Sequence, residues 1–328
     1  MRTLLLLLLL AICLQAQAAT LKIATLLPDG TIWMKAMRAS AREIEERTEG
    51  RLKLRFYPGG VMGNDKSVLR KIRVGQLHGG VLTTGSLAGI YKDIEIYSLP
   101  FLFRSFEEID YVRKKIDPLL IDNLARKGYI SFGLSEGGFV YLMSQTPISR
   151  EGELRRHKVW APEGDQISLI GFRSMGITPI QLPLTDVLTG LQTGLIDTIG
   201  ASPAGAIALQ WHTRVNYITD IPVLYLYGAL VITDKALARL PTSDRVILTE
   251  VLGEAIRQTD INTRKDNYNA WQALQKQGIE IVKPTPDDMK EWRAIVDRAV
   301  LQIGEEGAYT QKLYSRIQRY LADFRSTR

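Results

Sequence analysis

The sequence predicts an α/β protein of two lobes, each built on a parallel sheet that helices cover. Three observations support this fold class. The chain of 328 residues is longer than one hydrophobic core usually organises. The order strand–helix–strand–helix–strand occurs twice, and this order is typical of parallel sheets. Residues 242–278 have the pattern of one helix that is longer than a single lobe of this size.

Residues 1–19 predict an export signal. Arg2 places a positive charge at the start, Leu4–Leu14 is an almost unbroken apolar run, and Ala16-Gln17-Ala18 has small residues where a signal peptidase cuts. The apolar run is too short to span a bilayer, which takes about 20 residues. We therefore expect cleavage near Ala18 or Ala19 and a mature protein in the periplasm.

The composition of the mature chain excludes several kinds of chemistry. The only cysteine, Cys13, lies in the predicted signal and follows Ile12, which is not the small residue that lipid attachment needs. No disulfide or thiol chemistry is therefore expected after export. The net charge of +7 is spread along the chain, and the one basic group, Arg155-Arg156-His157-Lys158, is interpreted as a solvated loop. No nucleic-acid partner is expected.

The first lobe begins with a strand that runs into a Pro/Gly turn and a helix. The short strands are apolar, and the helices have apolar residues at helical spacing. Gly75 stands where a helix end favours a left-handed residue. The elements expected here are a strand at 21–25, a helix at 32–48, a strand at 52–57, a helix from 64 to 75 and a strand at 80–83.

The second lobe repeats this order. Ligands of open α/β sheets bind beyond the carboxyl ends of the strands, so two facing lobes predict a ligand cleft between them. The elements expected are a strand at 158–161, a helix at 166–175, a strand at 178–182, a helix from 184 to 194 and a strand at 196–201. The matching pairs, at one constant offset, are Val68/Val187, Leu69/Leu188, Ile72/Leu191, Gly75/Gly194 and Leu77/Ile196.

Two crossings and a long helix are expected to join the lobes. The chain should cross near 139–144 and near 223–228, and the helix at 242–278 should lie along the back of both lobes. Pro284 and Pro286 predict a break before amphipathic helices at 291–304 and 308–324. The predicted organisation is a signal peptide at 1–19, lobe I at 20–141 with about 226–252, lobe II at 142–225 with about 279–305, the spanning helix at 242–278 and a C-terminal helix at 306–328.

No catalytic, metal-binding or cofactor-binding residues are predicted. His78, His157 and His212 have no metal-ligand spacing, and no nucleophile-elbow, phosphate-loop or dinucleotide motif occurs. Asp29 and Asp197 lie near predicted strand ends, where they are interpreted as a turn former and a helix-to-strand junction. The sequence therefore predicts a binding protein and not an enzyme.

Six segments together resemble one protein family over nearly the whole mature chain. Each segment alone is a weak match to the family, but the order of the six segments and the distances between them are specific. They are Trp33, Glu45–Arg51, Phe56–Gly60, Gly85–Gly89, Leu99–Arg104 and Leu191–Asp197. On these residues the chain resembles the solute receptors of TRAP transporters (tripartite ATP-independent periplasmic transporters), of the DctP type. The resemblance implies a two-lobed periplasmic binding protein fold, a small-molecule ligand, and delivery of that ligand to the permease subunits of a TRAP-type membrane transporter.

The chain departs from the family pattern at three polar ligand-contact positions. It has Trp160 where the family usually has the arginine that binds the ligand carboxylate, and Val140 where a second arginine often follows Gly-Phe. The family's Glu-Asn before a proline corresponds to about Gly200–Ser202. On this comparison the chain is an atypical member that lacks the usual carboxylate-binding arginine. A carboxylate buried without a paired cation is strongly destabilised, so the sequence favours a neutral or hydrophobic ligand.

Two alternatives to a receptor for an apolar ligand stay open. In one, Trp160 is a core residue and an organic-anion site is rebuilt around another arginine, with Arg104, Arg173 and Arg214 as candidates. In the other, the protein is a periplasmic carrier of lipid or other apolar molecules and acts with an accessory periplasmic protein. The candidate ligand contacts are Trp33, Ser86, Val140, Trp160, Ala201, Ser202, Tyr225 and Tyr227.

Overall fold

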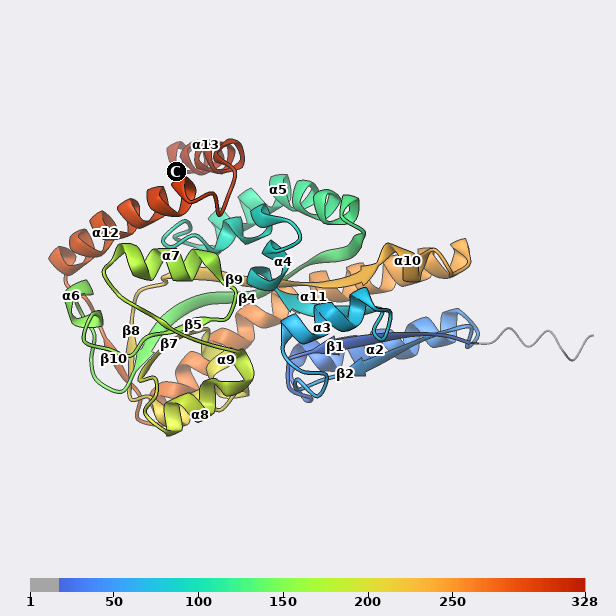
Figure 1. The fold of residues 1–328 in the computed structure, drawn as a ribbon, viewed down its shortest axis with the longest axis horizontal. Helices are drawn as coiled ribbons and strands as arrows, with labels where there is room; N and C mark the ends of the chain where they lie inside the picture. The colour runs from blue at the N-terminus through green and yellow to red at the C-terminus, as the bar shows by residue number, and fades with distance from the viewer. Residues whose placement is uncertain (1–17, 328) are drawn as a thin grey trace, which may run out of the picture.

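One eight-stranded sheet runs through both halves of the molecule (Figure 1). The computed structural model describes residues 18–327, so the predicted export signal lies outside the described residues except for its last two positions. The strand order is β10-β8-β4-β9-β3-β1-β2, β7 pairs with β4, and β5 and β6 form a separate sheet. The strands are β1 (Ala19–Thr25), β2 (Leu52–Tyr57), β3 (Gly79–Thr83), β4 (Tyr129–Ser144), β5 (Trp160–Pro162), β6 (Ile180–Leu182), β7 (Thr198–Ala201), β8 (Tyr217–Thr219), β9 (Leu224–Thr233) and β10 (Glu280–Val282).

Helices cover this sheet and connect its strands. No helix in the described part of the chain has the length and apolar character of a membrane span. The α-helices are α2 (Ile32–Arg47), α3 (Asp65–Arg73), α4 (Thr84–Ala88), α5 (Phe106–Arg126), α6 (Glu151–Leu154), α7 (Gln166–Ser174), α8 (Val187–Gln192), α9 (Pro203–Ala208), α10 (Asp234–Leu237), α11 (Thr242–Lys276), α12 (Pro286–Glu305) and α13 (Gln311–Ser326), and the 3-10 helices are η1 (Lys92–Ser98), η2 (Leu184–Asp186) and η3 (Trp211–Arg214).

We call the part built on β1, β2 and β3 lobe I. Strand β1 pairs in parallel with both β2 and β3. Helix α2 begins after Thr31, whose side chain accepts a hydrogen bond from the Met34 backbone N–H. Met34, Met37 and Ile44 are fully buried against the sheet. The element order predicted for this lobe is confirmed, because local capping and hydrophobic spacing decide it.

We call the part built on β5, β6 and β7 lobe II. Strand β5 pairs in parallel with β6, and a bridge between Val159 and Thr198 joins this pair to β7 in parallel. The predicted order of elements is confirmed here too. The expectation of a purely parallel sheet in each lobe is wrong, because β7 pairs antiparallel with β4, and β9 pairs antiparallel with β3.

Strands β4 and β9 cross between the lobes as one antiparallel pair. They pair from Tyr129 with Thr233 to Val140 with Leu224, and the register shifts twice along the way. At the second shift Gly138 has a φ of +92°, and a Cβ there would lie 2.6 Å from the Asn267 amide nitrogen. Only glycine fits both the backbone conformation and the contact.

Helix α11 is the predicted long helix. Its 35 residues span about 52 Å at 1.5 Å per residue. It packs on α2 of lobe I, on the crossing strand β4 and on α9 of lobe II. Leu252 and Ile256 of α11 belong to a hydrophobic cluster of lobe I, whereas Leu274 belongs to one of lobe II. One rigid helix therefore contacts both lobes, as Figure 1 shows.

The C-terminal helices return the chain to lobe I. Helix α12 starts at Pro286, earlier than the predicted 291, because Thr285 and Asp288 form a capping box and proline suits the first helical position. It packs against α7, and α13 packs against α5. Helix α5, which contains Pro118, has no counterpart among the elements predicted from the sequence.

Candidate ligand site between the lobes

The lobes contact each other where their strands end. The Asn64 amide, which follows β2, donates to the Glu163 carboxylate after β5 at 3.3 Å, and the Lys66 ammonium lies 4.0 Å from the same carboxylate. A Cβ on Gly60 would lie 3.1 Å from the Thr185 methyl group. The ends of β2, β5 and β6 therefore face each other, which is the geometry that ligand sites of α/β lobes require.

Glu95 of lobe I and Asp165 of lobe II both lie beside Gly85, at a second contact between the lobes. A Cβ on Gly85 would lie 3.1 Å from Oε1 of Glu95 and 3.3 Å from Cα of Asp165. Glu95 is 2% exposed. Burial, and then the charge of Asp165, raises the pKa of Glu95 to about 9. Asp165 caps α7 by accepting hydrogen bonds from the backbone N–H and the hydroxyl of Ser168, while burial raises its pKa.

Trp160 packs in the core of lobe II. The side chain is 5% exposed, and its ring meets that of Trp211 edge to face, with centroids 5.2 Å apart. Its indole Nε1 donates to the Leu182 carbonyl at 3.0 Å. Ala201 lies in the same hydrophobic cluster. The structure therefore brings Trp160 and Ala201 together, and the polar group of Trp160 is already bonded within the lobe.

Val140 and Ser202 lie close to this cluster and are also buried. Val140 is 4% exposed, and its Cγ1 would lie 3.2 Å from a Cβ on Gly200. The Ser202 hydroxyl accepts the Gly205 backbone N–H and so caps α9. Both side chains have structural roles in this arrangement.

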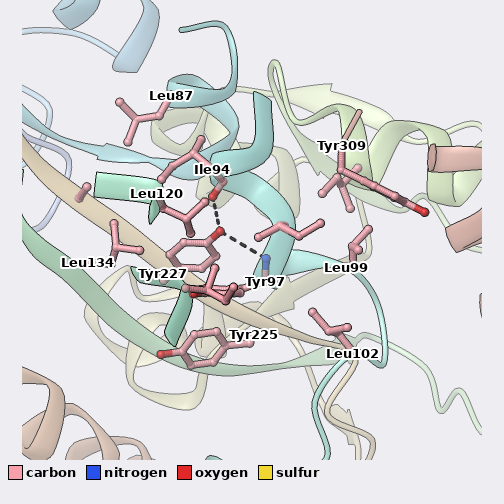
Figure 2. Close-up of a cluster of buried hydrophobic side chains, with 14 of the residues drawn as sticks. Leu87, Ile94, Tyr97, Leu99, Leu102, Leu120, Leu134, Tyr225, Tyr227 and Tyr309 are labelled. Carbon is pink, nitrogen blue, oxygen red and sulfur yellow. Dashed lines mark hydrogen bonds between the residues drawn. The ribbon is translucent and has the colours of Figure 1, made fainter. Parts of the chain in front are cut away.

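Tyr225 and Tyr227 belong to a different cluster, shown in Figure 2. Their rings stack with centroids 5.9 Å apart. The Tyr225 hydroxyl accepts from Arg113, and the Tyr227 hydroxyl donates to the Ile94 carbonyl and accepts the Tyr97 N–H. Burial raises the pKa of both phenols. These rings do not form one wall with Trp160, because the cluster around them contains neither Trp160 nor Ala201.

Trp33 and Ser86, the two candidates from lobe I, differ in their surroundings. The Trp33 indole donates to the Ser135 hydroxyl at 3.3 Å, and its ring packs edge-on against Phe56. Ser86 is half-buried and receives a hydrogen bond from the Thr83 hydroxyl. Ser86 follows Gly85 directly and so lies beside the contact with lobe II.

Among residues 18–327, no arginine at the boundary between the lobes is both buried and without a carboxylate partner. The three candidates for a relocated anion site are all exposed. The partly buried arginines near the crossing strands already contact carboxylates: Arg113 contacts Asp117 and Asp260, and Arg264 contacts Asp110 and Glu136. The exposed candidates are Arg104, Arg173 and Arg214.

Two cavities lie beside the 99–102 segment. One, of about 70 Å³, is apolar and reaches Ser168 next to Asp165. The other, of about 220 Å³, lies against α12 and α13, away from the contacts between the lobes. Residues 18–327 contain no group of three or more histidine, cysteine, aspartate or glutamate side chains that could hold a metal ion.

Sequence reasoning missed Glu95 and Asp165. A usable signal was present for each. Glu95 stands alone in the apolar run Ile94–Ile96, which indicates a buried carboxyl. Asp165 ends the turn after β5, immediately before a helical pattern, where aspartate is a favoured N-cap.

Two lobes that meet at their strand ends, joined by two crossing strands and one long helix, define a periplasmic binding protein fold. The model of the bacterial extracellular solute-binding protein family 7, DctP, matches residues 23–306, and the chain belongs to this family. The resemblance to DctP-type receptors is therefore confirmed. Membership of a solute-binding family also confirms the prediction of a binding protein and not an enzyme.

Relatives and solved structures agree with this assignment. The C4-dicarboxylate-binding periplasmic protein DctP of Rhodobacter capsulatus is 22% identical over 270 residues, which are 80% of each chain. The sugar acid binding protein of Advenella mimigardefordensis in complex with galactonate superposes with a TM-score of 0.87 at 18% identity, covering 94% of this chain and 99% of that one. A TRAP periplasmic solute-binding protein of Desulfovibrio salexigens with bound orotic acid gives 0.84 at 17% identity, covering 93% and 99%.

Proposed function

We propose that this protein is the periplasmic receptor of a TRAP transporter, that it binds a small organic acid between its lobes, and that it delivers the acid to the permease subunits. The family match over residues 23–306 carries the proposal. Solved structures of the same fold hold orotic acid, galactonate, β-D-galacturonate and succinate. All four are small polar carboxylic acids, which favours an organic anion over the neutral or hydrophobic ligand expected from the sequence.

The packing of the candidate apolar contacts supports the same choice. Trp160 and Val140 are each at most 5% exposed, and the ring of Trp160 is packed against Trp211. Little of their surface is left for an apolar ligand to cover, so they add little hydrophobic free energy to binding. Beside Gly85 the donor is neutral, the half-buried Ser86 hydroxyl, and the Lys66 ammonium at the other contact already faces the Glu163 carboxylate. Neutral hydrogen bonds contribute about 1 kcal/mol each, so we expect weaker binding than an arginine fork provides.

A panel of matched ligands tests the proposal. The protein would be heated with galactonate, galacturonate, succinate or orotate, and with galactitol, which has the galactonate skeleton but no carboxylate. A ligand at 100 times its Kd stabilises the folded state by about 2.7 kcal/mol, so at least one acid should raise Tm by several degrees. Galactitol should leave Tm unchanged. Equal shifts with galactonate and galactitol would contradict a carboxylate site.

A neutral or hydrophobic ligand is the second candidate. Its support is the apolar cavity of about 70 Å³ beside Ser168, together with Trp160 in the stretch where the sequence resemblance leads us to expect an arginine. Mass spectrometry of material released from natively purified, then denatured protein distinguishes the candidates. A copurified lipid or other apolar molecule, with no response to any acid, would favour this reading, including the carrier that acts with an accessory periplasmic protein.

A further inference from the structure

We propose that the cavity of about 220 Å³ between the 99–102 segment, α12 and α13 is a second binding site, separate from the contacts between the lobes, and that it takes a small organic cation, an amine that carries a ring. Among the described residues that line this cavity, none carries a positive charge. They are residues 99–102, Asp297, Val300, Leu301, Tyr314 and Gln318.

Most of the lining is apolar. Leu99 and Leu102 are at most 5% exposed and belong to the hydrophobic cluster in Figure 2, and Val300 of α12 belongs to the same cluster. An apolar protein cavity of about 150 Å³ binds benzene. The cavity of this protein is larger, so one aromatic ring fits against these side chains.

Hydrogen bonds hold the 99–102 segment in place on both sides. Phe101 has a left-handed φ of +55°, which is unusual for a residue other than glycine, and its backbone N–H donates to the Val223 carbonyl at 2.9 Å. The Leu102 carbonyl accepts from the Arg325 guanidinium at 3.3 Å. The cavity is therefore part of the folded protein, and a ligand does not have to create it.

Asp297 is the one charged residue among the described residues of the lining. Its side chain is exposed, and within residues 18–327 it has no hydrogen-bond or ion-pair partner. Arg293 stands four residues earlier on α12, at the spacing of a helical ion pair, but the pair does not form. A cation that enters the cavity therefore meets a carboxylate without displacing another partner.

Tyr314 and Gln318 add neutral polar groups close to this carboxylate. Burial raises the pKa of the Tyr314 phenol, the Gln318 amide lowers it, and the charge of Asp297 raises it again. The phenol oxygen and the amide oxygen can each accept a hydrogen bond from an ammonium group. An organic anion in the same place would face Asp297 with no cation beside it, so the lining favours an amine over an acid.

Three ligands with similar skeletons test the sign of the charge. Phenethylamine carries an ammonium group at neutral pH, phenethyl alcohol is neutral, and hydrocinnamate carries a carboxylate. Titrations followed by saturation-transfer NMR should give the tightest binding for the amine. An exposed ion pair changes an equilibrium by up to about fivefold, so Asp297→Asn should weaken the binding of the amine by about two- to fivefold and leave that of the alcohol unchanged.

Glu291→Gln is the matched control. It removes another exposed carboxylate of α12 that has no partner among the described residues, and Glu291 does not line the cavity. The affinity for phenethylamine should stay at the parent value in this variant. High salt should weaken the binding of the amine and not that of the alcohol, because an exposed ion pair is screened.

Photolabelling locates the site without any variant. Azidophenethylamine would be illuminated with the parent protein, and the labelled peptides would be identified by mass spectrometry. The label should fall within residues 99–102 or 297–318 and should be lost when phenethylamine is added in excess.

Four results would overturn the second site. They are no detectable binding of phenethylamine, equal affinities for the amine and the alcohol, an equal loss in the Asp297→Asn and Glu291→Gln proteins, and a label found only in other peptides. If Asp297→Asn does not fold, as judged by circular dichroism, the position of the label decides. The acids that bind between the lobes take no part in these measurements, so this inference and the proposed function fail separately.

Discussion

At the scale of single residues, the sequence did not predict the directions of the side chains. The replacement of a family arginine by Trp160 stays a prediction from the sequence pattern. A strand of three residues such as β5 exposes one face to the cleft and one to the lobe, and the sequence does not say which face a given residue takes. Tyr225 and Tyr227 share one face of β9 by their spacing, yet that face is the core. Glu95 was overlooked because Asp165, which lies on the other side of Gly85, is 70 positions away.

Trp160→Phe tests the role of this residue. The change removes the indole donor to the Leu182 carbonyl and leaves a smaller ring against Trp211. We expect the free energy of unfolding to fall by about 1–3 kcal/mol, because the Leu182 carbonyl keeps only the Glu163 N–H of its two donors and a small cavity forms beside Trp211. Urea denaturation measures this loss. The affinity for whichever acid the panel selects should stay within about twofold of the parent value, as judged by calorimetry.

The opposite pattern would show that Trp160 contacts the ligand. In that case the Phe variant would keep its stability and lose affinity. Phe172→Leu is a control within the same lobe, because Phe172 is partly buried and packs in a separate cluster with Trp292. The Phe172→Leu change should lower the free energy of unfolding without altering the affinity for the acid.

At the scale of elements, the sequence predicted what local signals decide. Helix caps, Pro/Gly turns and hydrophobic spacing placed α2, α3, α7 and the strands beside them. The pairing of β7 with β4 was not predicted, because antiparallel pairing across 50 or more residues leaves no local pattern. Helix α5 was also missed. Pro118 lies inside this helix, and a proline in a sequence predicts a helix break, although α5 continues through it.

One polar side chain of helix α11, Asn267, bonds both the crossing strand β4 and helix α9 of lobe II. The Asn267 amide donates to the Gly137 carbonyl of the crossing strand, and its oxygen accepts the Ala204 N–H at the start of α9. Asn267→Ala should lower the free energy of unfolding by about 1–3 kcal/mol, because two backbone groups lose their partner. Asn269→Ala, on the exposed side of the same helix, is the matched control and should be neutral or slightly stabilising.

Hydrogen exchange would locate the effect of Asn267→Ala. Amides at the start of α9 and around Gly137 should exchange faster in the variant, while those of α2 keep the parent rates. Equal stability of the Asn267 and Asn269 variants would mean that the helix is held by its apolar face alone.

At the scale of the whole molecule, the contacts between the lobes define an arrangement in which the ends of β2, β5 and β6 touch. A ligand can shift the balance between open and closed arrangements only by binding one of them more tightly. A small acid held between strand ends of both lobes contacts both lobes only when they are closed. Binding should therefore draw the lobes together and make the particle more compact.

Small-angle scattering of the mature protein, with and without the acid selected by the panel, measures this change. We expect the radius of gyration to fall on saturation. Thr185→Trp should prevent the fall, because the indole would overlap Gly60, whose Cβ position is already 3.1 Å from the Thr185 methyl. Thr193→Trp adds the same ring at an exposed position after α8 and should behave like the parent. A radius that stays unchanged at saturation in the parent protein would remove closure from the mechanism.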